Sequence, residues 1–352
     1  MGAHGNPVDH STNATMNIYI YVLRRLLLVI PVLLGLSLIT FSISRLVPGD
    51  PVGLAAGPQS TPEIRERMAA EFGLDRPIPE QYINYMAGVL QLDFGRSLYT
   101  KRDVNIELQA RIPATLELTL AAIIFASTIG IPLGIVSSLH QNKPPDHVSR
   151  LLTLFFVSFP SFWLAMIFQS ALGVYWDITP VAGRFPRLAI PPQRVTGLLS
   201  IDSLLAGDLT AFFSTLHHIA LPAFVLSLGA LASITRITRA SMLEALNNES
   251  VRTERSIGIP WALIVMKYVL RNAFTATFTI ISLEFGWLMA GAVLVEAIFG
   301  WPGLGGYIVD ASLNNDFQPI MGVTLVYGVI FSTVNIITDI CYGLIDPRIR
   351  FG

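Results

Sequence analysis

The sequence is poor in charged residues and almost free of cysteine. Only 13% of its 352 residues are Asp, Glu, Lys or Arg, about half of the share found in an average soluble domain. The 23 basic and 24 acidic residues leave a net charge of −1, which excludes a basic nucleic-acid-binding protein and an acidic disordered tail. The single cysteine, Cys341, excludes a disulfide framework and a cysteine-based zinc site.

The usual catalytic motifs are also missing. The chain has no Gly-x-x-x-x-Gly-Lys-Ser/Thr loop, no His-Glu-x-x-His and no Gly-x-Ser-x-Gly. The adjacent pair His217-His218 is a poor metal site, because successive side chains on a helix point about 100° apart. We therefore expect no catalytic residue, no metal site and no cofactor bound by this chain.

What the sequence has in abundance is long apolar runs. Six runs contain no Lys or Arg and are 19, 22, 26, 17, 23 and 22 residues long, at 26–44, 118–139, 151–176, 219–235, 273–295 and 317–338. A bilayer core about 30 Å thick takes about 20 apolar residues as a helix, and lipid offers unpaired backbone groups no partner. The sequence therefore predicts an all-α integral membrane protein with six transmembrane helices.

The positions of Lys and Arg predict the orientation of these helices. Short basic segments precede the first helix, separate the second from the third and the fourth from the fifth, and follow the sixth. These places share one side of the membrane, so both termini are expected in the cytoplasm. Eight basic residues in 45–111 and three in 177–218 oppose this orientation, although the first segment is long enough to escape the rule.

The remaining segments complete the expected organisation. Residues 1–15 are polar and predict a disordered leader, and 16–352 form a single transmembrane domain. Segment 45–111 predicts a small extracytoplasmic cap with one helix starting near Ser60 and a second, amphipathic helix around Tyr82–Leu90. Segment 177–218 predicts an irregular extracytoplasmic loop, because it contains four prolines.

The cytoplasmic segment 241–272 is the most informative part of the chain. Residues 249–260 read as a short charged helix that ends at Gly258, with Pro260 just beyond it. A plain connector needs only a few residues, whereas this segment is more than thirty residues long. It suits a rigid contact with a soluble partner.

The sequence resembles the permease subunits of bacterial binding-protein-dependent ABC importers, within the dipeptide/oligopeptide permease family. The family signature often reads Arg-Thr-Ala-Arg-Ala-Lys-Gly in peptide permeases, and this chain has Arg252-Thr253-Glu254-Arg255-Ser256-Ile257-Gly258. Glu254 and Ile257 depart from it. Further stretches similar to the family are Val47-Pro48-Gly49-Asp50-Pro51, Phe94-Gly95-Arg96-Ser97, Ile112-Pro113-Ala114-Thr115-Leu116-Glu117-Leu118, Phe299-Gly300-Trp301-Pro302-Gly303-Leu304-Gly305 and Asp346-Pro347-Arg348-Ile349-Arg350.

The resemblance implies a set of partners and a role for the signature. Such permeases lie in the bacterial cytoplasmic membrane and pair with a homologous second permease. Two ATPase subunits, which bind ATP and Mg²⁺, dock below, and an extracytoplasmic binding protein delivers the peptide. The signature forms the coupling helix, so the residues implied in the ATPase contact are Arg252, Thr253, Glu254, Arg255 and Gly258.

Within the spans, Glu284 is the candidate residue of the substrate path. It lies at the centre of the fifth apolar run, and a carboxylate at that depth is costly. It either faces a cavity and meets a substrate amine, or bonds to a neighbouring helix. Packing is the expected role of Gly130-Ile131-Pro132-Leu133-Gly134, a kink is expected at Pro160, and Trp301 is expected to anchor in the outer membrane face.

Three alternatives remain open from the sequence. The importer could carry nickel chelates, glutathione or another small solute instead of peptides, since the sequence of one permease does not distinguish among these substrates. A secondary transporter or channel without ATPases is a second alternative, but such proteins usually show internal repeats and more spans. A membrane scaffold that carries no solute is the third. Neither of the last two explains the turn at Gly258.

Overall fold

The computed structural model describes residues 18–46, 50–57 and 59–345, and the regular structure in these ranges is helical. The leader predicted at 1–15 lies outside them. The elements are α1 (Ile18–Leu46), α2 (Pro51–Ala56), α3 (Pro62–Glu71), α4 (Ile78–Leu90), α5 (Val104–Leu139), α6 (Pro144–Ser158), α7 (Ser161–Phe168), η1 (Gln169–Tyr175), α8 (Leu199–Leu205), α9 (Leu209–Leu246), α10 (Glu249–Ser256), α11 (Trp261–Leu263), η2 (Ile264–Val269), α12 (Leu270–Ile298), α13 (Leu304–Leu313) and α14 (Phe317–Ile345). The all-α prediction is confirmed.

Five unbroken helical stretches in the described ranges are long and apolar enough to cross a membrane. They are Leu23–Leu46, Val104–Leu139, Leu209–Leu246, Trp261–Ile298 and Phe317–Cys341. Each contains one of the predicted apolar runs, and several extend well beyond it. The chain is thus a multi-span membrane protein, and its described residues contain five continuous candidate spans.

The third apolar run is not the single straight span that its length suggests. Helix α6 and the following pair α7–η1 meet at an angle of 98°, so they make a sixth span only if the bent pair is counted as one. Pro160 is the cause, because proline disfavours helical backbone in the residue before it. Phe159 is accordingly extended, with φ −109° and ψ 139°. The predicted kink is therefore present as a complete break.

Helices α5 and α9 form the centre of the bundle because small residues let their backbones approach closely. A Cβ added at Gly134 would lie 2.7 Å from the Cβ of Thr238 and 2.8 Å from the carbonyl oxygen of Thr235. At Gly130 it would lie 3.1 Å from the carbonyl oxygen of Leu231. The packing role predicted for this pair of glycines is confirmed, and it is the contact expected of small residues four apart.

Substitution of Gly134 is expected to destabilise the bundle. A Cβ there would meet the Thr238 side chain at 2.7 Å and the backbone oxygen of Thr235 at 2.8 Å. A valine must therefore push α5 and α9 apart, and overpacking of this kind costs about 1–3 kcal/mol. The thermal unfolding midpoint of Gly134→Val in detergent should fall. Gly35→Val is the matched control, because nothing lies within 4 Å of a Cβ at Gly35 in α1. Equal midpoints for the two variants would contradict the close contact.

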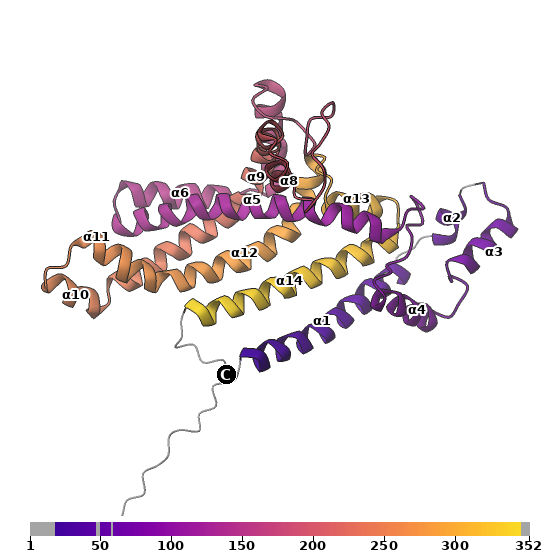
Figure 1. Cartoon of the computed structure of the whole chain (residues 1–352), viewed down its shortest axis with the longest axis horizontal. Coiled ribbons are helices and arrows are strands. Elements are labelled where there is room, and N and C mark those ends of the chain that lie inside the picture. Colours follow the sequence, from indigo (N-terminus) through magenta and orange to yellow (C-terminus); the bar gives the residue numbers. More distant parts are fainter. Residues whose placement is uncertain (1–17, 47–49, 58, 346–352) are drawn as a thin grey trace, which may run out of the picture.

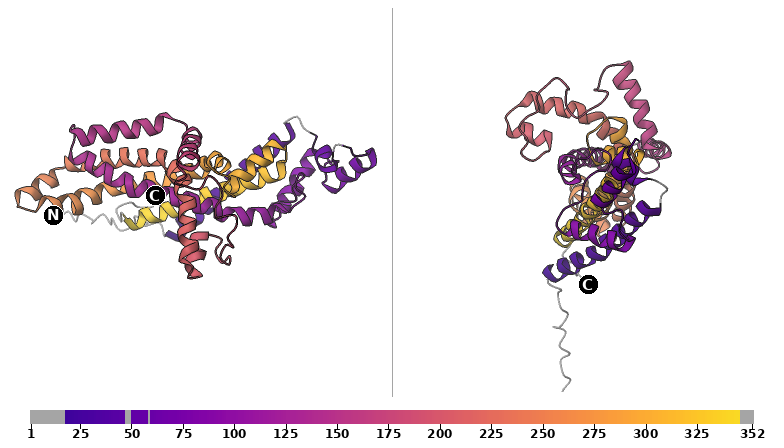
Figure 2. Two further views of the ribbon diagram at one scale, coloured as in Figure 1. Left: turned by 90° about the horizontal axis from the view of Figure 1, so that it is seen from above. Right: turned by 90° about the vertical axis from the view of Figure 1, so that its right-hand side faces the viewer.

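The two ends of the bundle carry different structures. The helices α10 and α11 lie at one end of the long axis, and the cap formed by α2, α3 and α4 lies at the other (Figures 1 and 2). Helix α1 runs alongside α14 at the edge of the bundle (Figure 1). The predicted cytoplasmic helix and the predicted extracytoplasmic cap are therefore as far apart as the fold allows.

Ion pairs account for much of the basic charge that opposed the predicted orientation. In segment 45–111, five of the basic residues pair with carboxylates at 2.5–3.2 Å, namely Arg65, Arg76, Arg96, Arg102 and Arg111. In segment 177–218, Arg184 pairs with the buried Glu117, and Arg194 donates a 2.5 Å hydrogen bond to the carbonyl of Gln109. These side chains are held by the protein, so the orientation with both termini in the cytoplasm stays our prediction.

Candidate functional site

Helix α10 presents most of the signature to the outside. Among its residues, Arg252, Thr253 and Arg255 are exposed, while Glu254 is half-buried and its Oε2 has no hydrogen-bond partner in the structure. The guanidinium of Arg255 lies 5.4 Å from the ring centroid of Trp261, which fixes its direction. The structure thus leaves Arg252, Thr253 and Arg255 accessible from outside, while Glu254 is partly covered.

A Schellman motif ends α10 at the predicted glycine. Gly258 has φ +84°, its N–H donates to the carbonyl of Arg255, and the next N–H, of Ile259, donates to the carbonyl of Glu254. This pair of bonds satisfies carbonyls that a helix end leaves free, and it favours glycine because of the positive φ. The end of α10 is therefore set by the local sequence.

Apolar contacts fasten α10 to the bundle. Val251 is 6% exposed and belongs to a cluster with Met242 of α9, Ile264 of η2 and Ala273 of α12, and Ile259 packs against the same cluster. A force on α10 would therefore reach α9 and α12 through packed side chains. Such packing would allow a displacement of α10 to move the membrane-spanning helices with it.

The structure places Glu284 in the lining of a pocket. The pocket, of about 410 Å³, lies where the break between α6 and α7 faces α9 and α12, and its walls include Phe159, Ser161, Gly229, Ser233 and Trp287. Within the described residues the Glu284 carboxylate makes no hydrogen bond or ion pair. The alternative of a bond to a neighbouring helix therefore has no contact to support it.

A second pocket continues from the first toward the α10 end and is basic. It has a volume of about 330 Å³, shares Val157 with the Glu284 pocket, and is lined by Arg150, Arg236 and Arg239. Arg239 is held by the buried Asp146 at 2.7 and 2.9 Å. The sequence interpretation used Arg150 and Arg236 only for topology, although Gly229, Ser233 and Arg236 follow the spacing of one helix face.

Another buried centre surrounds Glu296, for which the sequence indicates a packing or topology role near a span end but no contact partner. Glu296 is fully buried in α12 and accepts hydrogen bonds from Thr115 Oγ1 at 2.6 Å, from the N–H of Gly305 at 2.6 Å and from that of Gly306 at 3.2 Å. The carboxylate thus binds the N-terminal end of α13, where a helix offers unpaired N–H groups. No local signal in the sequence connects Thr115 with Glu296.

The prediction that Trp301 anchors in the membrane face is wrong. Its side chain is 2% exposed, and its indole N–H donates a 2.8 Å hydrogen bond to the carbonyl of Ala114. Buried indoles usually need such a partner. The side chain therefore helps to hold the turn before α13 against α5.

The histidine pair is used for local contacts. The Nε2 atom of His217 lies 2.8 Å from the carbonyl oxygen of Ile178, and Nδ1 of His218 lies 2.8 Å from that of Ser214. Among the residues that the structure describes, no three His, Cys, Asp or Glu side chains are grouped closely enough to hold a metal ion.

Comparison with known families identifies the class of protein. Residues 130–351 match the family described as the binding-protein-dependent transport system inner membrane component, and residues 18–119 match the N-terminal domain of such membrane components. The chain belongs to this family. It is a multi-pass protein of the bacterial inner membrane.

Individual relatives narrow the class to permeases. The dipeptide transport system permease protein DppB of Escherichia coli K12 is 39% identical over 333 residues, which cover 94% of this chain and 98% of that protein. The di/tripeptide permease DppB of Pseudomonas aeruginosa is 40% identical over 332 residues, 94% of this chain and 98% of that one. The glutathione permease GsiC of Salmonella choleraesuis is 33% identical over 331 residues, 94% of this chain and 99% of that one.

Proposed function

We propose that this chain is a transmembrane subunit of an ATP-driven importer that moves dipeptides and oligopeptides across the bacterial cytoplasmic membrane by alternating access. The observation that carries the proposal is α10, an exposed charged helix that is anchored in the bundle through Val251 and ended by Gly258. Relatives named as dipeptide permeases match almost the full length of the chain. Both findings favour a pore-forming subunit that works with a separate motor.

The proposed assembly contains three kinds of partner protein. A homologous second permease completes the pore, two ATPase subunits bind ATP and Mg²⁺ and press on α10, and an extracytoplasmic binding protein delivers the peptide. This chain contributes no catalytic residue and no cofactor site. Arg252, Thr253, Glu254 and Arg255 supply the contact with the ATPase, Glu254 being the least exposed of the four, and Gly258 sets the end of the helix.

The two neighbouring pockets supply a path that suits a peptide. Glu284 offers a carboxylate for the terminal ammonium group, and Arg150 and Arg236 in the adjoining pocket offer guanidinium groups for carboxylates. A peptide carries both charges, so each of its ends can make a charge-assisted hydrogen bond in these neighbouring pockets. Glutathione also carries both charges, and the match to GsiC keeps it as the alternative solute.

Reconstitution tests the class of transporter. The chain is co-expressed with the sister permease and the ATPases and placed in proteoliposomes with the binding protein. Uptake of labelled dialanine should require ATP and the binding protein. Uptake that persists without ATP, driven by an ion gradient, would favour an ATPase-independent secondary transporter or channel and would overturn the proposal.

Replacement of Glu284 tests the path. We expect Glu284→Gln to lower the uptake of peptides with a free amino terminus about tenfold, since a charge-assisted hydrogen bond contributes about 1.5–3 kcal/mol. N-acetylated peptides, which lack the ammonium group, should lose much less. Glu244→Gln is the matched control, because Glu244 is exposed at the end of α9 and outside both pockets. Equal losses for free and acetylated peptides would contradict the role of Glu284.

A further inference from the structure

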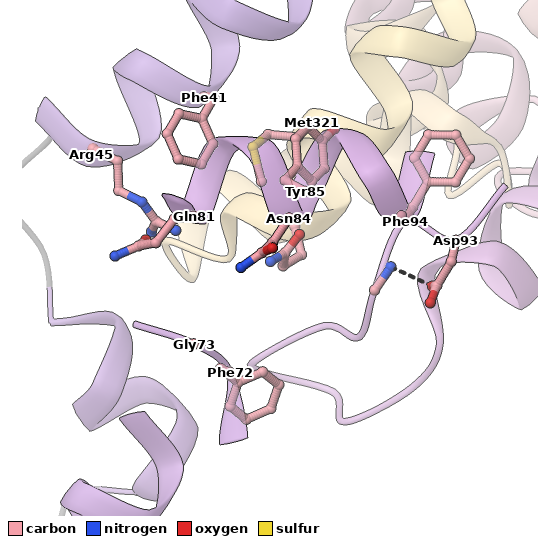
Figure 3. Close-up of a pocket in the computed structure, with 13 residues that line it drawn as sticks. Phe41, Arg45, Phe72, Gly73, Gln81, Asn84, Tyr85, Asp93, Phe94 and Met321 are labelled. Carbon is pink, nitrogen blue, oxygen red and sulfur yellow. Dashed lines mark hydrogen bonds between the residues drawn. The ribbon is translucent and has the colours of Figure 1, made fainter. Parts of the chain in front are cut away.

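A third pocket, at the cap end of the bundle, contains polar atoms that the fold leaves without partners. It has a volume of about 180 Å³ and lies between the end of α1, the turn after α3, helix α4, the turn before α5 and the start of α14 (Figure 3). Four of its lining residues contribute a buried polar atom with no hydrogen-bond partner, namely Arg45 Nε, Gln81 Oε1, Tyr85 Oη and Gln318 Oε1.

This concentration of unpaired atoms is unusual. Buried polar groups are nearly always hydrogen-bonded, and each unpaired group costs about 1–3 kcal/mol. Four of the ten such side-chain atoms found in the described residues line this one pocket. The pocket is therefore built to be filled by something that hydrogen-bonds.

The neighbouring contacts fix the direction of these groups. Gln81 Nε2 donates a 2.7 Å hydrogen bond to the carbonyl of Arg76, so the amide oxygen faces the pocket. The guanidinium of Arg45 lies 5.0 Å from the ring centroid of Phe41, and Arg45 makes no ion pair within the described part of the chain. Burial raises the pKa of the Tyr85 hydroxyl, so this group stays neutral and can both donate and accept.

The charges lie at opposite sides of the pocket. Figure 3 shows Arg45 beside Gln81 on one side, Asp93 on the other, and Asn84 and Tyr85 between them. Asp93 accepts one hydrogen bond through Oδ1, from the N–H of Gly95 at 2.8 Å. An occupant therefore meets a cation at one end, a carboxylate at the other and amide groups between.

We propose that this pocket binds a small zwitterion, a short peptide or a free amino acid, with its carboxylate on Arg45 and its ammonium group on Asp93. The carbonyl oxygens of Gln81 and Gln318 then accept from N–H groups of the ligand. The assignment rests on the proposed peptide import, and it adds a second station for the solute at the predicted extracytoplasmic end, far from Glu284.

Binding to the full-length chain in lipid nanodiscs, without partners or ATP, tests the assignment by calorimetric titration. The probes are dialanine, N-acetyl-dialanine, dialanine amide and alanine. Arg45→Gln should weaken dialanine binding about tenfold and leave dialanine amide unchanged, because the amide has no carboxylate to lose. Asp93→Asn should weaken dialanine in the same way and leave N-acetyl-dialanine unchanged. Alanine that binds as tightly as dialanine would identify a free amino-acid site.

Three controls keep the result interpretable. Arg67→Gln removes an exposed arginine of the same cap outside the pocket and should change nothing. Arg45→Lys keeps the charge and should retain most of the binding, and unfolding midpoints show whether each variant is folded. Glu284→Gln removes the carboxylate of the other proposed peptide site, so binding that persists in this variant but is lost in Arg45→Gln belongs to the cap pocket.

The outcomes separate this assignment from the proposed function. A wild-type chain that binds no probe, or an Arg45→Gln variant as tight as wild type, overturns the site and shows that the pocket holds only water. Peptide import by the full complex would then still stand. Zwitterion binding in nanodiscs without any ATP-dependent uptake by the complex would support the site and count against the import function.

Discussion

Gly258→Val should separate ATP hydrolysis from transport in the reconstituted complex. The residue has φ +84° and nothing lies within 4 Å of a Cβ placed there, so the effect of the valine is conformational and not a clash. Left-handed backbone costs an L-residue roughly 1–2 kcal/mol, and more when it is β-branched. The fraction of molecules in which α10 ends in the conformation that fits the ATPase would fall about tenfold. We expect peptide uptake to fall by about that factor while ATP hydrolysis continues.

The fold contains a matched control for this variant. Gly207, in the turn between α8 and α9, closes α8 with the same pair of hydrogen bonds, has φ +69° and also has nothing within 4 Å of a Cβ. Gly207→Val therefore imposes the same backbone strain away from the proposed motor contact and should leave coupling intact. Gly258→Asn should be milder than Gly258→Val, because asparagine tolerates this conformation. Normal transport by Gly258→Val would exclude the coupling role.

The structural features that could be predicted are those that depend on residues close together in the sequence. Apolar runs identify spans because lipid forces backbone groups to pair within the helix. The end of α10 at Gly258 was predictable for a similar reason, since the Schellman motif involves residues only a few positions apart. Pro160 also predicted an interruption of the helix, although a proline alone does not determine whether the helix kinks or breaks, here by 98°.

The features that were missed or wrong depend on contacts between distant segments. Thr115 and Glu296 are 181 positions apart, and the cap pocket joins Phe41 of α1 to Met321 of α14. Periodicity reports that a face is buried, but it does not report which helix covers it. Trp301 illustrates the difficulty. A tryptophan near the end of a span is typical of the membrane face, but here its N–H donates to the carbonyl of Ala114 and the side chain is buried.

Glu296→Ala should have the largest effect on folding. The alanine would leave the buried hydroxyl of Thr115, the buried N–H of Gly305 and the half-buried N–H of Gly306 without their acceptor. Each unpaired donor costs about 1–3 kcal/mol, so the loss should reach at least about 3 kcal/mol. The start of α13 and the turn at Trp301 would loosen together. The measurable result is a lower yield of monodisperse protein and an unfolding midpoint lower by about 5 °C or more.

The best control for Glu296 lies in the same helix. Glu284 also belongs to α12 but has no hydrogen bond or ion pair in the described structure, so Glu284→Ala should leave the unfolding midpoint almost unchanged while it impairs uptake. Glu296→Gln should fall between wild type and Glu296→Ala. Its amide keeps one acceptor oxygen but turns an NH₂ group toward other donors. Glu296→Ala with a wild-type midpoint would show that Glu296 does not hold α13, whereas a large drop for Glu284→Ala would assign that carboxylate to packing.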